Sequence, residues 1–297
     1  MRRLLPIGAF VLLVALTFAL TGGNGTGTTV PAATRNPGTS TAPRTTAGAS
    51  STSSTMSAQV TATSSRCRVA GPAVTRTLVN ELAALCVRSA RTVDRAWGEE
   101  WGGVLTRLVV AGDINELAGL LGRDDTKGLT DTAAVTVGPH DAPADAVFIN
   151  GPAFDGLTDL GRQVVLTHEL VHVAARAAGD SDAPLWLEEG YADYVAYRGT
   201  GLSAREIAGE ALAAPLPQSL PAVDDFDASD AGAAVAYGQA WVAVTVLADR
   251  LGSDAALKRL YEKAAHSGTD EALRSAGFVS RTALVRAVRQ RMTHLDR

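Results

Sequence analysis

The sequence V-V-L-T-H-E-L-V-H-V at residues 164–173 combines a largely apolar segment with helical spacing and two histidines four residues apart. Residues four apart on a helix differ by about 40° in direction, so His168 and His172 project from neighbouring turns of one face and can share a metal ion. The apolar flanks predict a buried helix, and ionisable groups on a buried helix need partners. A surface helix with solvated histidines is therefore the weaker alternative.

This spacing suits hydrolytic chemistry on a metal ion. A zinc ion (Zn²⁺) held by neutral imidazoles and one carboxylate keeps a fourth position open for water and lowers the pKa of that water towards neutrality. Glu169 points about 100° away from His168 and stays beside the metal position. We therefore expect His168 and His172 as zinc ligands and Glu169 as the catalytic general base.

A second stretch, W-L-E-E-G-Y-A-D-Y at residues 186–194, supplies carboxylates for a third metal ligand. We expect Glu189 to be that ligand. Asp193 follows four residues later on the same helical face, where it can accept a proton from a ligand histidine's other ring nitrogen. Glu188 has no such partner, and its expected role is a solvated acid in the first helical turn.

Other arrangements of the third ligand are less favoured. Asp180 and Asp182 lie in an expected loop only a few residues past the helix that carries both histidines. The metzincin pattern H-E-x-x-H-x-x-G-x-x-H is excluded, because Ala175 and Ala178 stand where its glycine and third histidine would be.

The two stretches resemble the gluzincin metallopeptidases, and most closely the peptidase MA-like domains, in which a W-L-x-E-G-x-A segment supplies the ligand glutamate. The resemblance extends over about residues 140–295, although only the two motifs are specific. Carried over by position, it implies zinc ligands His168, His172 and Glu189, the general base Glu169, and Asp193 beside a ligand histidine. It also implies a zincin-like fold that hydrolyses a peptide or protein substrate.

One departure from that group bears on the substrate. Gluzincin aminopeptidases carry a G-x-M-E-N segment before the metal helix, but the methionines here are Met1, Met56 and Met292, and no such segment is present. We therefore expect an endopeptidase-like enzyme. The apolar run at 145–150 predicts a strand before the metal helix, either an edge strand that pairs with an extended substrate or an ordinary internal strand.

Stabilising a transition state requires a hydrogen-bond donor aimed at the developing oxyanion. Tyr237 is our candidate for this catalytic role, because it stands downstream of Glu189 at the start of an apolar helical stretch. The alternative is a core tyrosine with a satisfied hydroxyl.

Hydrophobic periodicity predicts strands before helices. Strands are expected near 104–111, 133–137 and 146–150, and helices at 74–97, 113–121, 157–178, 185–198, 203–213, 232–251, 254–265, 268–275 and 281–294. This order predicts an α+β enzyme, with a small mixed α/β lobe and short sheet followed by a mainly helical lobe. The active site is expected in the cleft between the two lobes.

The N-terminal region predicts export from the cytoplasm. Residues 1–20 hold an apolar run after two arginines, which fits either a signal peptide or an N-terminal membrane anchor. Residues 21–65 are dominated by Thr, Ser, Gly, Ala and Pro and predict a disordered linker. We assign 66–297 to the metallopeptidase domain and expect it outside the cytoplasmic membrane, either membrane-anchored or secreted.

The charge distribution disfavours a nucleic-acid partner. Four of the 27 Lys and Arg residues and none of the 31 acids precede residue 66, so residues 66–297 carry a net charge of −8. A surface of that sign repels phosphate backbones. No pattern in the sequence predicts an oligomeric state.

Cys67 and Cys86 are the two cysteines of the chain. An even number of cysteines in a chain expected to be exported predicts a disulfide bond. Zinc ligation by the same pair is the weaker alternative, because no second cysteine pair is present.

Together these patterns predict a zinc-dependent hydrolase in which Glu169 takes a proton from zinc-activated water. That its substrate is a peptide bond is what the resemblance to gluzincins implies. The alternative from another class is a catalytically silent, zinc-stabilised extracellular binding module. The intact Glu169 disfavours that alternative, because structural zinc needs no general base.

Overall fold

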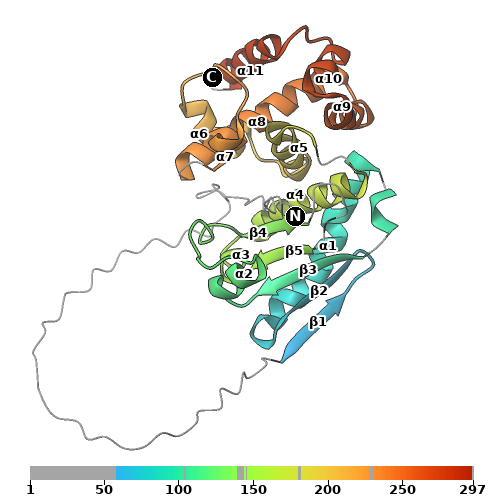
Figure 1. The fold of residues 1–297 in the computed structure, drawn as a ribbon, viewed down its shortest axis with the longest axis vertical. Coiled ribbons are helices and arrows are strands. Elements are labelled where there is room, and N and C mark those ends of the chain that lie inside the picture. Colours follow the sequence, from blue (N-terminus) through green and yellow to red (C-terminus); the bar gives the residue numbers. More distant parts are fainter. Residues whose placement is uncertain are drawn as a thin grey trace, which may run out of the picture.

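A computed structural model describes residues 58–98, 100–103, 105–138, 144, 146–179, 182–227 and 230–295. The chain forms one sheet in its first part and is mostly helical afterwards, so the expected α+β class is confirmed (Figure 1). The segment 1–20 and most of the expected linker 21–65 lie outside the described residues.

The sheet contains five strands. They are β1 (Gln59–Thr63), β2 (Cys67–Pro72), β3 (Thr106–Ala111), β4 (Ala134–Val137) and β5 (Ala146–Asn150). Their order across the sheet is β1-β2-β3-β5-β4. The middle strands β2, β3 and β5 run parallel, whereas β1 and β4 pair antiparallel to their neighbours at the two edges.

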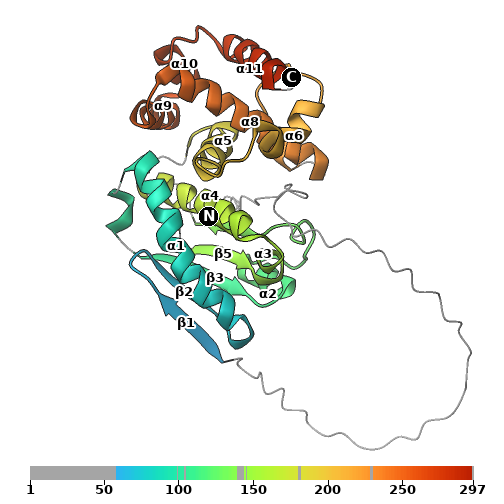
Figure 2. The ribbon, with the colours of Figure 1, turned by 180° about the vertical axis from the view of Figure 1, so that it is seen from behind.

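Helices cover both faces of the sheet. On one face lie α1 (Arg76–Trp97) and α4 (Asp159–Ala177), which pack against each other and bury their apolar residues in the main core (Figure 2). In α1 the buried Leu78, Leu82 and Leu85 recur at helical spacing. On the opposite face, α2 (Ile114–Leu120) forms a smaller cluster with Phe148 of β5.

The first strand corrects the expected start of the folded region. β1 lies inside 21–65, the range expected to be a linker, yet it pairs with β2 along its whole length. Val60 of β1 is buried in the main core. Two apolar residues, Val60 and Ala62, in a short polar segment are too weak a pattern to predict a strand, and only the partner strand makes it one.

The strand predicted at 145–150 is an internal strand. Its described part is β5, which lies between β3 and β4. Val147 and Ile149 are fully buried, as expected for a strand with neighbours on both sides. The edge strand beside the histidine helix is β4, and it contacts α4.

The second part of the chain is helical. It comprises α5 (Leu185–Ala196), α6 (Ala204–Ala213), α7 (Val223–Phe226), α8 (Asp230–Leu251), α9 (Asp254–Ser267), α10 (Thr269–Ser275) and α11 (Arg281–Leu295). Helix α8 contacts α5, α6 and α11 (Figure 1). Gly190 lets α5 approach α8 closely, because a Cβ there would lie 2.4 Å from the carbonyl O of Ala240. The two parts of the chain meet where α4 packs against α5 and where α1 packs against α9 and α5.

Helix α8 is also long and apolar enough to cross a membrane. Among the described residues, Ala231–Leu251 is the one such segment, with a mean hydropathy of 1.4. In this structure 61% of the most apolar 18-residue stretch of this segment is buried, and Val242, Val244 and Leu247 are fully buried. The apolar composition therefore serves the core of the helical part.

Most predicted elements are present, with ends shifted by a few residues. The predicted helix 157–178, for example, begins at Asp159 after the Thr158 cap and is preceded by a separate short helix. The sequence patterns did not predict β1, β2, α3 (Gly151–Asp155), α7 or the 3-10 turn Glu100–Gly103, and the first residues of the predicted helix 74–97 belong to the 3-10 turn Ala73–Thr75. All are short, so their periodicity carries little information.

The expected disulfide is confirmed. Cys67 of β2 and Cys86 of α1 are bonded and fully buried. The bond fastens α1 to the sheet and, in the loop-entropy model, stabilises the fold by about 3 kcal/mol.

Candidate metal centre

Helix α4 carries the two histidines on a buried helix, as the periodicity predicted. It starts with Thr158, whose side chain accepts a hydrogen bond from the main-chain N–H of Gly161. From Val164 to Arg176 every residue is buried, because the sheet, α1 and α5 surround the helix. His168 is 1% exposed and His172 is 8% exposed.

Helix α5 brings the carboxylates against α4. Glu189 is 1% exposed, and Asp193 follows one helical turn later on the same face. His168, His172 and Glu189 form a buried group in which one ligand atom from each lies within 4.8 Å of the others. Asp182 is exposed and outside this group, and Asp180 lies outside the described residues.

The distances within the group fit a single shared ion. Nε2 of His168 lies 3.0 Å from Nε2 of His172 and 3.1 Å from Oε2 of Glu189. Nε2 of His172 lies 3.6 Å from Oε1 of Glu189. Ligand atoms bound tetrahedrally to one ion at about 2.1 Å are roughly 3.4 Å apart. The spacing of the three side chains is therefore close to that of ligands that share one ion.

Asp193 determines which nitrogen of His168 faces the group. Its Oδ1 lies 2.9 Å from Nδ1 of His168, so the neutral imidazole donates from Nδ1 and presents the lone pair of Nε2 to Glu189. Both carboxylate oxygens of Glu189 are buried and have no hydrogen-bond donor among the described residues. Several electron-pair donors thus converge on one point, and such a point requires a cation.

The pKa values show the same requirement. Burial alone would lower the pKa of His168, but the hydrogen bond to Asp193 and the nearby carboxylate of Glu189 outweigh it and raise that pKa well above the usual value. Burial would raise the pKa of Glu189, but the charge of His172 and the contacts with His168 lower it to about 2. Without metal, a proton on His168 supplies positive charge at this point, so protons and metal compete for it.

Glu169 directly follows His168 in α4 but does not belong to the group. It is 1% exposed, and the hydroxyl of Thr136 in β4 lies 2.6 Å from its Oε2. The sheet therefore contributes to the centre through its edge strand. Thr136 was not among the predicted residues, because no local pattern connects it with a helix 33 residues later.

Glu188 differs from its predicted role. It lies in the first turn of α5 as expected, but it is 6% exposed, so it is not a solvated acid. Burial and then the charge of Glu189 raise the pKa of Glu188 well above its usual value, although Arg176 opposes the shift. Arg176 is itself 4% exposed and donates to the carbonyl O of Gly138. Its place four residues after His172 on one helical face could have been noticed from the sequence.

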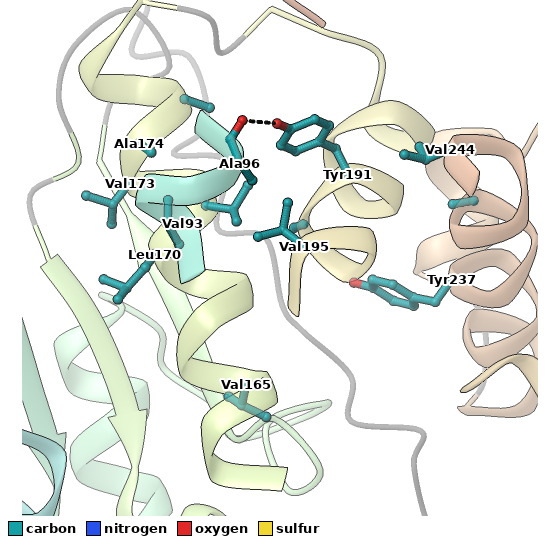
Figure 3. Close-up of a cluster of buried hydrophobic side chains, with 14 of the residues drawn as sticks. Val93, Ala96, Val165, Leu170, Val173, Ala174, Tyr191, Val195, Tyr237 and Val244 are labelled. Atoms are coloured by element: carbon teal, nitrogen blue, oxygen red, sulfur yellow. Dashed lines mark hydrogen bonds between the residues drawn. The ribbon is translucent and has the colours of Figure 1, made fainter. Parts of the chain in front are cut away.

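Tyr237 lies close enough to the carboxylates to interact with them electrostatically. It is 9% exposed, and burial followed by the charges of Glu189, Asp193 and Glu169 raises its pKa well above the usual value. In Figure 3 its hydroxyl points from α8 towards α5. Its ring packs edge-on against Phe226. These contacts suit both the catalytic and the core role.

A packed apolar cluster holds the helices of the centre in place. Side chains of α1, α4, α5 and α8 meet there, and the hydroxyl of Tyr191 donates to the carbonyl O of Ala96 at 3.3 Å (Figure 3). The rings of Tyr191 and Trp97 stack edge-to-face with centroids 5.5 Å apart. Close packing of this kind fixes α5 against α4 and hence the carboxylates against the histidines.

The chemistry of the centre thus rests on its own residues. Two histidines from α4 and one glutamate from α5 form a buried group that could bind a metal ion, and Glu169, which follows His168 in the sequence, is also buried. No protein-family model, curated protein or solved structure matches the chain, so no relative assigns a role to these residues.

Proposed function

We propose that this chain is a zinc-dependent peptide-bond hydrolase of the gluzincin type, endopeptidase-like and active outside the cytoplasmic membrane. The observation that carries the proposal is the carboxylate of Glu169. This residue directly follows His168 in α4, is 1% exposed, and is not part of the group formed by His168, His172 and Glu189. A metal that only stabilised the fold would need no general base, and hence no further buried carboxylate next to a ligand histidine in the sequence.

Zinc is the ion that we assign to the group. Two imidazoles and one carboxylate form the donor set of catalytic zinc sites, which leave one position for water or substrate. When bound, zinc supplies a Lewis acid that polarises a carbonyl and lowers the pKa of water. Asp193 supports the assignment, since an aspartate on the second nitrogen of a ligand histidine is a recurrent partner in zinc sites.

The chain's own residues perform the proton transfers. Glu169 accepts a proton from the attacking water and delivers it to the amine that leaves when the peptide bond breaks. Tyr237 donates a hydrogen bond to the oxyanion of the substrate. Asp193 holds the ring of His168, and burial of the whole group keeps competing water away.

The fold supports a zincin-like arrangement. In this proposal the substrate lies in a cleft between the sheet part and the helical part, which meet at α4 and α5. The strand that pairs with an extended peptide is β4 rather than β5, because β4 is the sheet edge next to α4. Backbone pairing binds peptides with little demand on their side chains, which suits an endopeptidase.

The location outside the cytoplasmic membrane is supported by the disulfide bond. Cys67 and Cys86 are bonded, and such bonds persist mainly in oxidising compartments. The segment 1–20 would either anchor the chain in the membrane or be removed as a signal peptide.

The test combines metal analysis with peptide cleavage. The full chain is reconstituted with zinc, its metal content is measured, and its hydrolysis of a quenched-fluorescent peptide library is recorded. We expect about one zinc per chain, loss of zinc in Glu189→Ala, and retained zinc with cleavage about 10²- to 10⁴-fold slower in Glu169→Gln. Glu271→Gln, which changes an exposed glutamate in α10, is the matched control and keeps both properties.

Two results would reject the proposal. Zinc bound at one per chain with no cleavage across the library would favour the silent, zinc-stabilised binding module. Absence of bound zinc after reconstitution would remove the metal centre altogether.

A further inference from the structure

We propose that Thr136 is the positioning residue of Glu169. Its hydroxyl holds the carboxylate by Oε2, so that Oε1 is the oxygen that accepts the proton from water. The inference rests on the proposed function, since it concerns the same catalytic base. It assigns a role to the edge strand β4 other than contact with substrate.

The contact between the two side chains is short and dry. Oγ1 of Thr136 lies 2.6 Å from Oε2 of Glu169, which is the range of a hydroxyl that donates to an ionised carboxylate. The same hydroxyl lies 3.2 Å from the main-chain O of Glu169, but its one proton goes to the nearer and charged acceptor. Both residues are 1% exposed, so water does not replace this hydrogen bond.

The strand that carries Thr136 is itself fixed. Thr136 is paired in register with Val147 of β5, so its place along the sheet is set by the ladder. Arg176 donates from Nη1 to the carbonyl O of Gly138 at 3.2 Å, two residues past Thr136. Glu169 and Arg176 are two helical turns apart on α4, so the helix holds the end of β4 at two points on one face. The hydroxyl therefore reaches Glu169 from a rigid support.

A buried carboxylate with one oxygen fixed in this way has a defined direction. Small displacements of a catalytic group cost much of its effect, because proton transfer requires hydrogen-bond distance and alignment. Without the hydroxyl, the carboxylate of Glu169 would lose this partner in a dry environment and turn towards another donor. Valine at position 136 has nearly the shape of threonine and removes only the hydroxyl. Serine keeps the hydroxyl and removes only a methyl group.

The experiment compares Thr136→Val with Thr136→Ser in the full, zinc-loaded chain. Kinetics use the best-cleaved peptide of the quenched-fluorescent library. We expect Thr136→Val to lower kcat about 10- to 100-fold with KM and zinc content unchanged. Thr136→Ser should retain most of the wild-type kcat. Thr132→Val is the matched control, because it removes another fully buried threonine hydroxyl, one that donates to the carbonyl O of Gly128. It should affect thermal stability but leave kcat unchanged.

A second readout does not need activity. Crystal structures of the metal-free variants should show the Glu169 carboxylate displaced in Thr136→Val and unmoved in Thr136→Ser. An unmoved carboxylate in Thr136→Val, or a Thr136→Ser variant as slow as Thr136→Val, would overturn the role of Thr136. If the wild type cleaves no peptide but the carboxylate is displaced in Thr136→Val, the proposed function fails while the positioning contact stands.

Discussion

Two faces of helix α5 carry adjacent glutamates with opposite electrostatic behaviour. Glu189 faces the histidines of α4 and has its pKa lowered to about 2, whereas Glu188 has its pKa raised well above the usual value. Both are buried, at 1% and 6% exposure. Burial raises the pKa of either carboxyl, and the difference is that imidazoles converge on Glu189 while Glu188 meets the charge of Glu189 with only partial relief from Arg176. Charged partners, rather than depth, decide which acid stays ionised.

The largest expected effect is a difference in zinc affinity between variants of the two glutamates. Glu189→Gln should weaken zinc binding by more than the roughly 10- to 100-fold that loss of an outer partner costs, because it removes a charged ligand. Glu188→Gln should bind zinc as the wild type does. Titration against a competing chelator measures both affinities. Equal losses in the two variants would show that the faces do not differ in function.

The next effect tests the support of the ligand face. Asp193→Asn should weaken zinc binding about 10- to 100-fold, because the amide no longer holds His168 as a charged acceptor. Asp249→Asn, at an exposed ion pair of α8 with Arg291, is the control and should bind zinc normally. An unchanged affinity in Asp193→Asn would mean that packing alone orients the imidazole.

A third face of α5 packs on α8 at Gly190. A Cβ there would lie 2.4 Å from Ala240 O and 2.9 Å from Val244 Cγ2, so Gly190→Ala must push the helices apart. We expect a loss of about 1–3 kcal/mol in the free energy of unfolding, measured with denaturant, and weaker zinc binding as Glu189 moves with α5. Gly209→Ala is the control, since nothing lies within 4 Å of its added Cβ. Wild-type stability in Gly190→Ala would show that α5 can shift freely.

The smallest expected effect is on the pH dependence of the metal-free chain. The raised pKa of Glu188 means that its penalty to stability is absent below the unfolded value near 4.5, grows as pH rises from there towards the folded pKa, and is constant above it. Glu188→Gln should therefore raise Tm at neutral pH, by about 2–4 °C for each ~1 kcal/mol gained, and leave it unchanged at pH 4.

Glu189 has the opposite sign. Its lowered pKa contributes stability above pH 4.5 that is lost as pH falls towards 2. Glu189→Gln should therefore lower Tm between pH 4.5 and the raised pKa of His168, with the difference shrinking in stronger acid. Thermal unfolding measured across pH checks both variants. Parallel Tm profiles for Glu188→Gln and Glu189→Gln would contradict the contrast between the faces.

Much of the centre could be predicted because it is local. The pairing of His168 with His172 follows from helical period alone, and the same spacing placed Asp193 on the face of Glu189. The choice of Glu189 over Glu188 used that local argument, and the structure brings Glu189 to the histidines. The predicted exposure of Glu188 to solvent was wrong. The first turn of a helix is usually solvated, and only the packing of α5 on α4 buries this side chain.

By itself, the sequence determined the elements whose patterns are long: the buried α4, the apolar α8, and the cysteine pair that could bond. Local periodicity suffices there, because each helix must bury its apolar residues whatever lies next to it. Only the tertiary structure decided that β1 joins the sheet, that β4 rather than β5 is the edge beside α4, and that Thr136 meets Glu169. Those contacts join residues far apart in the chain, and their geometry depends on how the layers pack rather than on any local preference.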